Sequence, residues 1–203
     1  MVSGGCVRQT CGMQSSQPLT ERLLHSRTVL VFGEIDAELA ERTNAQLFAL
    51  AGASDAPITM VISSPGGHVE SGDAVHDVVR FIAPEVRMLG TGWVASAGAL
   101  IYIAAPRERR FATPNTRFLL HQPLGAYQGS AADIEIQAEQ ILAMRRRLDA
   151  LFAAATGQPF ERVARDTDRD HWLTASAALD YGLVGSIVER SAEVEVSVQR
   201  AKR

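Results

Sequence analysis

The sequence predicts an α/β fold, in which a single domain is built around a largely parallel β-sheet. From residue 28 to residue 188, short β-branched, apolar segments alternate with longer segments of helical periodicity. This alternation is typical of parallel strands joined by crossover helices. The same stretch contains no Pro- or Ser-rich linker and no sequence repeat. A chain of 203 residues is also long enough to bury about 70% of its unfolded surface in one core.

Apolar segments that stop at glycine are predicted strands, and segments with apolar residues every three or four positions are predicted helices. In the N-terminal half we expect strands at 28–33, 58–63 and 86–90, and helices at 36–52, 69–83 and 95–105. Asp36 is the predicted N-cap of the first helix, because its carboxylate can accept hydrogen bonds from the first backbone N–H groups. The segment 95–105 is apolar almost throughout, so we expect that helix to be buried on all sides.

In the C-terminal half we expect strands at 109–114, 116–121 and 183–188, and helices at 130–156, 160–166 and 174–181. The longest helix is predicted to end at Gly157, because glycine readily adopts the left-handed conformation that closes a helix. Pro159 lies just beyond that glycine and cannot continue a helix.

Both ends of the chain are predicted to be tails around a folded domain at 20–190. Residues 1–19 are small and polar and lack the apolar stretch of about 7–15 residues that a secretory signal needs. We expect them to be flexible or to be a leader removed on maturation, and we expect the charged segment 191–203 to fray. Cys6 and Cys11 lie in the N-terminal tail, so the folded part has no disulfide framework or cysteine metal site, which is compatible with a cytoplasmic protein.

The composition is that of an ordinary globular protein, with 46% hydrophobic and 21% charged residues. A net charge of −3 gives no reason to expect nucleic acid or an anionic membrane as a partner. The sequence contains no apolar stretch of about 18 residues, the length that a membrane span requires, so we expect no membrane span. The HExxH, Walker A and GxGxxG motifs do not occur, so we expect no metal, no nucleotide and no other cofactor bound to this chain.

The run GTGWVASAGALIY (90–102) places one hydroxyl, that of Ser96, among tiny and apolar residues. Most buried serines are structural, and such a residue can simply allow close packing. Alternatively Ser96 is a nucleophile, surrounded by small residues so that backbone N–H groups can approach a substrate. The N–H of Ala97 at the start of the following helix, and a second N–H in the Ser64-Pro65-Gly66-Gly67 turn, could then bind an oxyanion.

A serine hydroxyl needs a base, and the base needs a carboxylate that fixes its tautomer. His121 ends the predicted strand at 116–121, and loops at the carboxyl ends of strands are where ligands bind in α/β folds. Carboxylates crowd the segment ARDTDRDHW (164–172), which offers Asp166, Asp168 and Asp170. Spacing alone does not choose among the three. The chain order Ser, His, Asp also differs from that of the α/β-hydrolases, whose GxSxG elbow is missing.

The chain resembles the proteolytic subunit of the Clp protease in four stretches that occur in the same order: SSPGG (63–67), GWVASAGAL (92–100), HQPLGAYQGSAADIEIQAEQIL (121–142) and DTDRDHWLTASAALDYGLVGSIV (166–188). The resemblance runs from about Leu19 to Val188. It implies a serine endopeptidase with a crotonase-like spiral of ββα units. It also implies a strand and helix at 122–136 that protrude as a handle, interdigitate between rings and line a groove where peptide adds as a strand.

The resemblance also implies the role of each site residue. Ser96 matches the nucleophile, His121 the general base and Asp170 the carboxylate of the triad. Gly67 and Ala97 match the two oxyanion donors. The pair that helps one ring dock on the other is matched by Asp168 and Arg169.

The partners implied are further copies of this chain, or a second ClpP-type subunit, in stacked heptameric rings. An AAA+ unfoldase of the ClpX, ClpC or ClpA type would use ATP to deliver unfolded proteins. In the family, the pocket on the ring that receives the unfoldase is commonly lined by aromatic and large apolar residues. At the matching positions this chain keeps that character only at Leu89 and Phe111 and departs from it elsewhere, at Thr59, Val61, Thr91 and Thr113. We therefore expect weaker docking on rings made only of this chain.

Other positions depart from the family pattern near the nucleophile. Ala97 stands where the family usually has Met, so we expect the oxyanion hole to survive and the side pocket to grow. Trp93 and Val94 replace a commoner small or polar pair, and Gln17-Pro18-Leu19-Thr20 lacks the usual large entrance residue. Two other functions remain open: a low-activity or structural ring subunit that supports an active partner, and a crotonase-type acyl-CoA enzyme.

Overall fold

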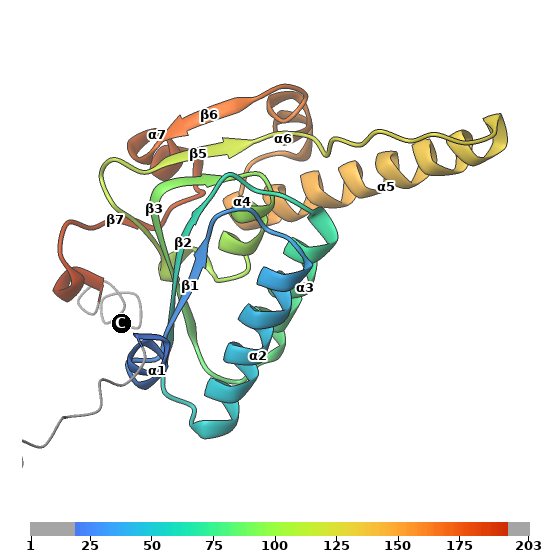
Figure 1. The fold of residues 1–203 in the computed structure, drawn as a ribbon. Coiled ribbons are helices and arrows are strands. Elements are labelled where there is room, and N and C mark those ends of the chain that lie inside the picture. Colours follow the sequence, from blue (N-terminus) through green and yellow to red (C-terminus); the bar gives the residue numbers. More distant parts are fainter. Residues whose placement is uncertain (1–18, 195–203) are drawn as a thin grey trace, which may run out of the picture.

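The computed structural model describes residues 19–194, and its strands form one seven-stranded sheet. Strands β1, β2, β3, β4 and β7 lie side by side in that order, and β5 and β6 extend the sheet from the far end of β3 (Figure 1). All the neighbouring strands run parallel except β5 and β6. The predicted α/β class with a largely parallel sheet is confirmed.

The strands are β1 (Thr28–Phe32), β2 (Ile58–Ser64), β3 (Val86–Ala95), β4 (Arg110–Ala112), β5 (Arg117–Leu120), β6 (His171–Thr174) and β7 (Ser186–Ile187). The helices are α1 (Leu19–His25), α2 (Ala37–Ala53), α3 (Val69–Phe81), α4 (Ala97–Tyr102), α5 (Ala131–Thr156), α6 (Phe160–Asp166) and α7 (Ala175–Tyr181). A single 3₁₀ turn, η1 (Arg107–Arg109), precedes β4. None of the helices in residues 19–194 is both long and apolar enough to cross a membrane.

The core lies between one face of the sheet and helices α2, α3 and α4 (Figure 1). Alternate residues of β2 point to this face, so Met60 and Ile62 are fully buried against a layer that includes Leu47 and Leu100. Asp36 caps α2 as predicted, because its carboxylate accepts a 2.8 Å hydrogen bond from the N–H of Leu39. Helix α4 is buried at all six of its residues, in agreement with its apolar sequence.

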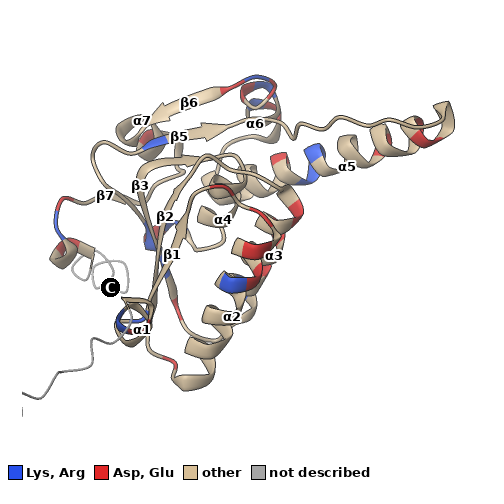
Figure 2. Ribbon diagram, viewed as in Figure 1, with Lys and Arg blue, Asp and Glu red and all other residues tan. Residues whose placement is uncertain are grey.

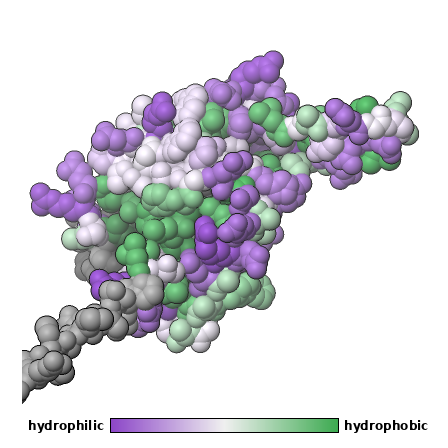
Figure 3. All heavy atoms as spheres, viewed as in Figure 1, coloured by the Kyte–Doolittle hydropathy of each residue, from purple (hydrophilic) through white to green (hydrophobic). Residues whose placement is uncertain are grey.

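The opposite face of the sheet is uncovered at β1, whereas Phe111 of β4 on the same face is buried with Val188. Leu30 and Phe32 of β1 remain 38% and 50% exposed, and Figure 3 shows an apolar patch at the position of the sheet. Strands β1 and β2 contain no charged residue, and in Figure 2 the charges lie mainly on the helices and loops. This uncovered face is a surface suited to contact with another protein chain.

Helix α5 projects far beyond the body of the domain (Figure 1). It begins at a capping box of Ser130 and Asp133 and ends at Gly157, whose φ is 74°, as the sequence predicts. Residues 131–140 are all exposed, and residues 121–130 form no strand within the described chain. The helix of the predicted handle is therefore present, whereas its strand segment has no strand partner in residues 19–194.

Three parts of the fold differ from the prediction. Strand β3 continues to Ala95 rather than ending at Gly90, because Gly92 adopts a φ of 62° that lets the strand turn from β4 to β5. The following helix consequently starts at Ala97. Helix α1 and strand β6 are additional elements. The predicted tails lie mostly outside the described residues, as do Cys6 and Cys11.

Candidate active site

Ser96 and His121 lie together at the carboxyl ends of two adjacent strands. Ser96 follows β3 and His121 follows β5, and these strands pair in parallel with Ala95 opposite Leu119. The N–H of Ser96 donates a 2.9 Å hydrogen bond to the carbonyl of Leu119. Both side chains line one cavity, so the structure brings together the predicted nucleophile and base.

The backbone of Ser96 is held in an unusual conformation, with a φ of 53° and a ψ of −119°. A positive φ in a residue other than glycine costs about 1–3 kcal/mol and persists only where the surroundings enforce it. The hydroxyl does not cap α4, and no hydrogen bond from it to another described residue occurs. Such a strained turn with an unused hydroxyl is typical of a nucleophile rather than of a packing serine.

The glycine turn lies directly against Ser96. A Cβ added to Gly66 would come within 2.6 Å of Ser96 Cβ, and Gly66 itself has a φ of 99°. The turn is held by a 3.0 Å hydrogen bond from the N–H of Gly66 to Ser64 Oγ and by a 2.8 Å bond from Ile35 to the carbonyl of Gly66. Position 66 must therefore be glycine if the hydroxyl is to stay where it is.

Gly67 is equally restricted, since its φ is 150° and a Cβ there would collide with the carbonyl oxygen of Ile35. Among the hydrogen bonds of residues 19–194, none uses the backbone N–H of Gly67 or of Ala97. These are the two N–H groups that the sequence predicts as oxyanion donors, and both remain available to a ligand.

His121 and Asp170 are in contact, with 3.2 Å between Nδ1 and Oδ1. Strand β6 runs antiparallel to β5 with His171 opposite Leu120, which places the residue before β6 beside the residue after β5. The imidazole is largely buried and the Asp170 carboxylate is 65% exposed. Pairing of the two strands thus selects one of the three carboxylates that spacing leaves open.

The other two carboxylates have different partners. Asp166 accepts a 3.0 Å hydrogen bond from the hydroxyl of Tyr181, and burial together with this carboxylate raises the pKa of Tyr181. Asp168 Oδ1 accepts a 3.0 Å hydrogen bond from Arg145. Asp168 and Arg169 are both exposed, as residues that contact another ring must be, but a single chain does not test that role.

The cavity beside Ser96 is small and apolar. Helix α5 contributes Leu148 and Phe152 to its wall, opposite Ala97 and Leu100 of α4. It encloses about 10 Å³, room for about one water molecule. Ala97 lines this cavity, and whether it enlarges the side pocket relative to a Met at this position stays a prediction.

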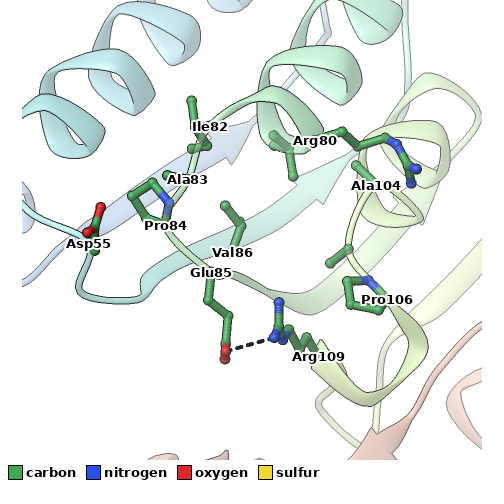
Figure 4. A pocket seen from close by; sticks show the side chains of 12 residues that line it. Asp55, Arg80, Ile82, Ala83, Pro84, Glu85, Val86, Ala104, Pro106 and Arg109 are labelled. Atoms are coloured by element: carbon green, nitrogen blue, oxygen red, sulfur yellow. Dashed lines mark ion pairs between the residues drawn. The ribbon is translucent and has the colours of Figure 1, made fainter.

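A larger hollow of about 490 Å³ lies at the opposite edge of the sheet, before β3 and β4. Its walls include Asp55, Arg80 and Pro106, and Glu85 and Arg109 in the same lining form an ion pair (Figure 4). The two charged groups are 2.9 Å apart. It contains none of the predicted site residues. Residues 19–194 also contain no group of three or more His, Cys, Asp or Glu side chains arranged to hold a metal ion.

Comparison with known proteins identifies the family. A family model described as Clp protease matches residues 12–191. The chain is 60% identical over 172 residues to the ATP-dependent Clp protease proteolytic subunit 3 of Rhizobium etli, covering 85% of this chain and 89% of that protein. It is 52% identical over 181 residues to proteolytic subunit 2 of Pseudomonas aeruginosa, covering 89% and 90% of the two chains. The solved structure of ClpP1 from Listeria monocytogenes is similar with a TM-score of 0.79 and 48% identity, over 87% of this chain and 99% of that one.

Proposed function

The chain belongs to the Clp protease family and is a serine endopeptidase subunit, in which we propose that Ser96, His121 and Asp170 cleave the peptide bond. The observation that carries this assignment is the contact between His121 Nδ1 and Asp170 Oδ1, made next to a cavity that His121 shares with Ser96.

The reaction begins when Ser96 Oγ attacks the carbonyl carbon of the substrate. Nε2 of His121 takes the hydroxyl proton, while Asp170 accepts a hydrogen bond from Nδ1–H and stabilises the imidazolium. The negative charge that develops on the carbonyl oxygen is bound by the N–H groups of Gly67 and Ala97. His121 then returns the proton to the leaving amine, and a water molecule hydrolyses the acyl-enzyme by the same steps. The chemistry requires no cofactor on this chain.

The hydrogen bond from Ser96 to His121 is not formed in the described chain. Catalytic hydrogen bonds are often long in a protein without substrate and shorten when substrate binds. The segment 121–130, which begins at His121, forms no helix or strand, so its backbone groups have no strand partner in residues 19–194 and a substrate can add there as a strand. Backbone pairing of this kind accepts many sequences and requires an unfolded substrate.

We further propose that copies of this chain, or of this chain and a second ClpP-type subunit, assemble into stacked heptameric rings in the cytoplasm. The uncovered apolar sheet face (Figure 3) and the projecting helix α5, with Ile134, Ile136 and Leu142 exposed, support such contacts. An AAA+ unfoldase of the ClpX, ClpC or ClpA type would supply unfolded chains to the rings, with Asp168 and Arg169 helping one ring dock on the other.

A second candidate function is that of a subunit that mainly supports a partner ring. Relatives are named proteolytic subunit 2 or 3, which fits rings of more than one type. A Ser-His-Asp set of residues at one site favours a subunit that cleaves peptides itself. A crotonase-type reaction has no comparable support, because such enzymes commonly use glutamates as acid and base.

Hydrolysis of a permanently unfolded protein, with and without an AAA+ unfoldase, tests the proposal. The purified chain should release short peptides, and Ser96→Ala in the same particle should not. If the wild-type particle is inert alone and becomes active only with a second subunit whose own serine is required, the supporting role is correct and the active one is wrong.

A further inference from the structure

Arg145 of helix α5 is held between the two segments that carry the base and the carboxylate of the proposed triad. Its Nη1 donates a 2.9 Å hydrogen bond to Gln122 Oε1, and its Nη2 donates a 3.0 Å bond to Asp168 Oδ1. Gln122 directly follows His121, and Asp168 precedes Asp170 by two positions. One guanidinium therefore contacts a close neighbour of each of these two triad members.

The two segments are also joined to each other. Gln122 Nε2 donates a 2.7 Å hydrogen bond to the carbonyl of Asp168, and the N–H of Gln122 donates a 2.7 Å bond to the carbonyl of Thr167. Together with the bonds from Arg145, these interactions form a closed ring of hydrogen bonds. Such a ring fixes relative position better than any of its bonds would alone.

Helix α5 anchors this ring through a buried carboxylate. Asp149 is buried, and its Oδ1 accepts a 2.8 Å hydrogen bond from Thr167 Oγ1. Arg145 Nε lies 3.9 Å from Asp149 Oδ2, so the guanidinium also compensates a charge that would be costly to bury alone. The backbone of 167–168 is thereby fastened to the same helix that supplies Leu148 and Phe152 to the cavity.

We infer that Arg145 is a positioning residue, which holds Asp170 against His121 without touching the substrate. This inference rests on the proposed triad. The Asp170 carboxylate is 65% exposed, and an exposed ion pair is weak by itself. Its orientation must therefore come from the backbone on either side, and Arg145 links this backbone to the segment after His121 together with the side chain of Gln122.

The effect expected from loss of Arg145 is specific. Misplacing a catalytic group by about 1 Å can lower the rate about 100-fold. Arg145 does not line the cavity beside Ser96, so substrate binding should change little. Truncation of this side chain should lower kcat and leave KM nearly unchanged, as expected when a catalytic group is misplaced and the binding surface is intact.

The experiment compares Arg145→Gln, Arg145→Lys and the matched control Arg146→Gln in the full-length assembled protein. Arg146 is exposed, and no ion pair joins it to another of the described residues. With a short fluorogenic peptide, we expect kcat of Arg145→Gln to fall about 10- to 100-fold with KM within about twofold of wild type. Lysine can replace one of the donated bonds, so Arg145→Lys should recover part of the loss, and Arg146→Gln should behave as wild type.

Hydrogen exchange gives a readout that does not depend on activity. In Arg145→Gln the segment 166–171 should exchange faster than in wild type while the core strands do not change. The inference is overturned if kcat and this exchange are both unchanged, or if Arg146→Gln reproduces the loss. Should Arg145→Gln fail to assemble, Arg145→Lys, Gln122→Ala and the double variant decide. Residues of one hydrogen-bonded ring should show non-additive losses of kcat, so the loss in the double variant should differ from the sum of the two single losses. Additive losses would also overturn the inference. If wild-type activity proves independent of Ser96, the proposed function is wrong, and the exchange measurement still tests the role of Arg145.

Discussion

His121 Nδ1 lies 3.2 Å from Asp170 Oδ1, although the two residues are 49 positions apart in the chain. The antiparallel pairing of β5 with β6 brings them together. This contact distinguishes Asp170 from the two similar aspartates near it in sequence and supports the proposal that His121 acts as the base.

Asp170→Asn should lower kcat about 10⁴-fold, because an amide does not hold the imidazole in the tautomer that accepts the serine proton. Peptidase kinetics on the assembled particle measure the effect. Asp166→Asn is the matched control, since Asp166 bonds to Tyr181 and should leave kcat near wild type. Equal losses in the two variants would show that the wrong carboxylate has been assigned.

Gly66→Ala should lower peptidase activity at least about 100-fold, since the new Cβ would come within 2.6 Å of Ser96 Cβ. Gly33→Ala is a suitable control, because Gly33 also has a positive φ, of 86°, but a Cβ there meets nothing within 4 Å. Gly33→Ala should cost about 1–2 kcal/mol of stability for its positive φ, measured by thermal unfolding, and Gly66→Ala should cost more because of the close contact with Ser96. Only the change at Gly66 should abolish labelling of Ser96 by an active-site serine probe; labelling that survives there would contradict the packing described.

Arg169→Ala should weaken the stacking of rings and lower activity with it, although Arg169 does not touch the substrate. An exposed ion pair contributes only about 0–1 kcal/mol, but a ring repeats the contact in every subunit, so small losses add. Sedimentation of the variant should show single rings where wild type forms double rings. Arg165→Ala, an exposed arginine on the same segment, provides the comparison. If Arg169→Ala still forms double rings of full activity, Arg169 has no role in ring stacking and forms at most a surface ion pair.

Thr59→Tyr with Val61→Tyr should strengthen docking of an AAA+ unfoldase on rings of this chain. Both residues alternate with the buried Met60 and so point to the uncovered sheet face. Burying one large apolar side chain contributes about 1.5–3 kcal/mol, so docking should improve by one or two powers of ten per anchor. Binding of the unfoldase to immobilised rings measures this; wild-type rings that already bind as tightly as the double variant would refute the expectation.

The sequence predicts most of this fold because most elements carry their own signal. Strand β2 alternates buried and half-buried residues along its length, and α2 has an N-cap and a regular apolar face. Strand β6 has four residues, of which one is buried. It is stabilised by pairing with β5, and the local sequence of β6 gives no sign of that pairing. The extension of β3 depends on the conformation of Gly92, a residue that in sequence indicates the end of a strand.

The site shows the same division between local and long-range information. His121 and the glycine turn can be found from sequence because each follows a recognisable strand, and Ser96 can be found because it is the one hydroxyl in a run of tiny and apolar residues. Spacing does not choose Asp170 over Asp168; the family resemblance chooses it, and the pairing of β5 with β6 gives the physical reason. The ring of hydrogen bonds around Arg145 joins segments far apart in the chain. No spacing pattern in the sequence predicts the hydrogen bonds of Arg145, so they are found only in the structure.

The central claim is that Ser96 is the nucleophile, and mass measurement after reaction with a fluorophosphonate serine probe tests it most directly. The account predicts one adduct per chain, located on the peptide that contains Ser96, and none in Ser96→Ala or in the denatured protein. Asp170→Asn should slow the labelling without moving it. A fully assembled, peptide-cleaving particle that carries no adduct on Ser96, or carries it on another residue, would contradict the account.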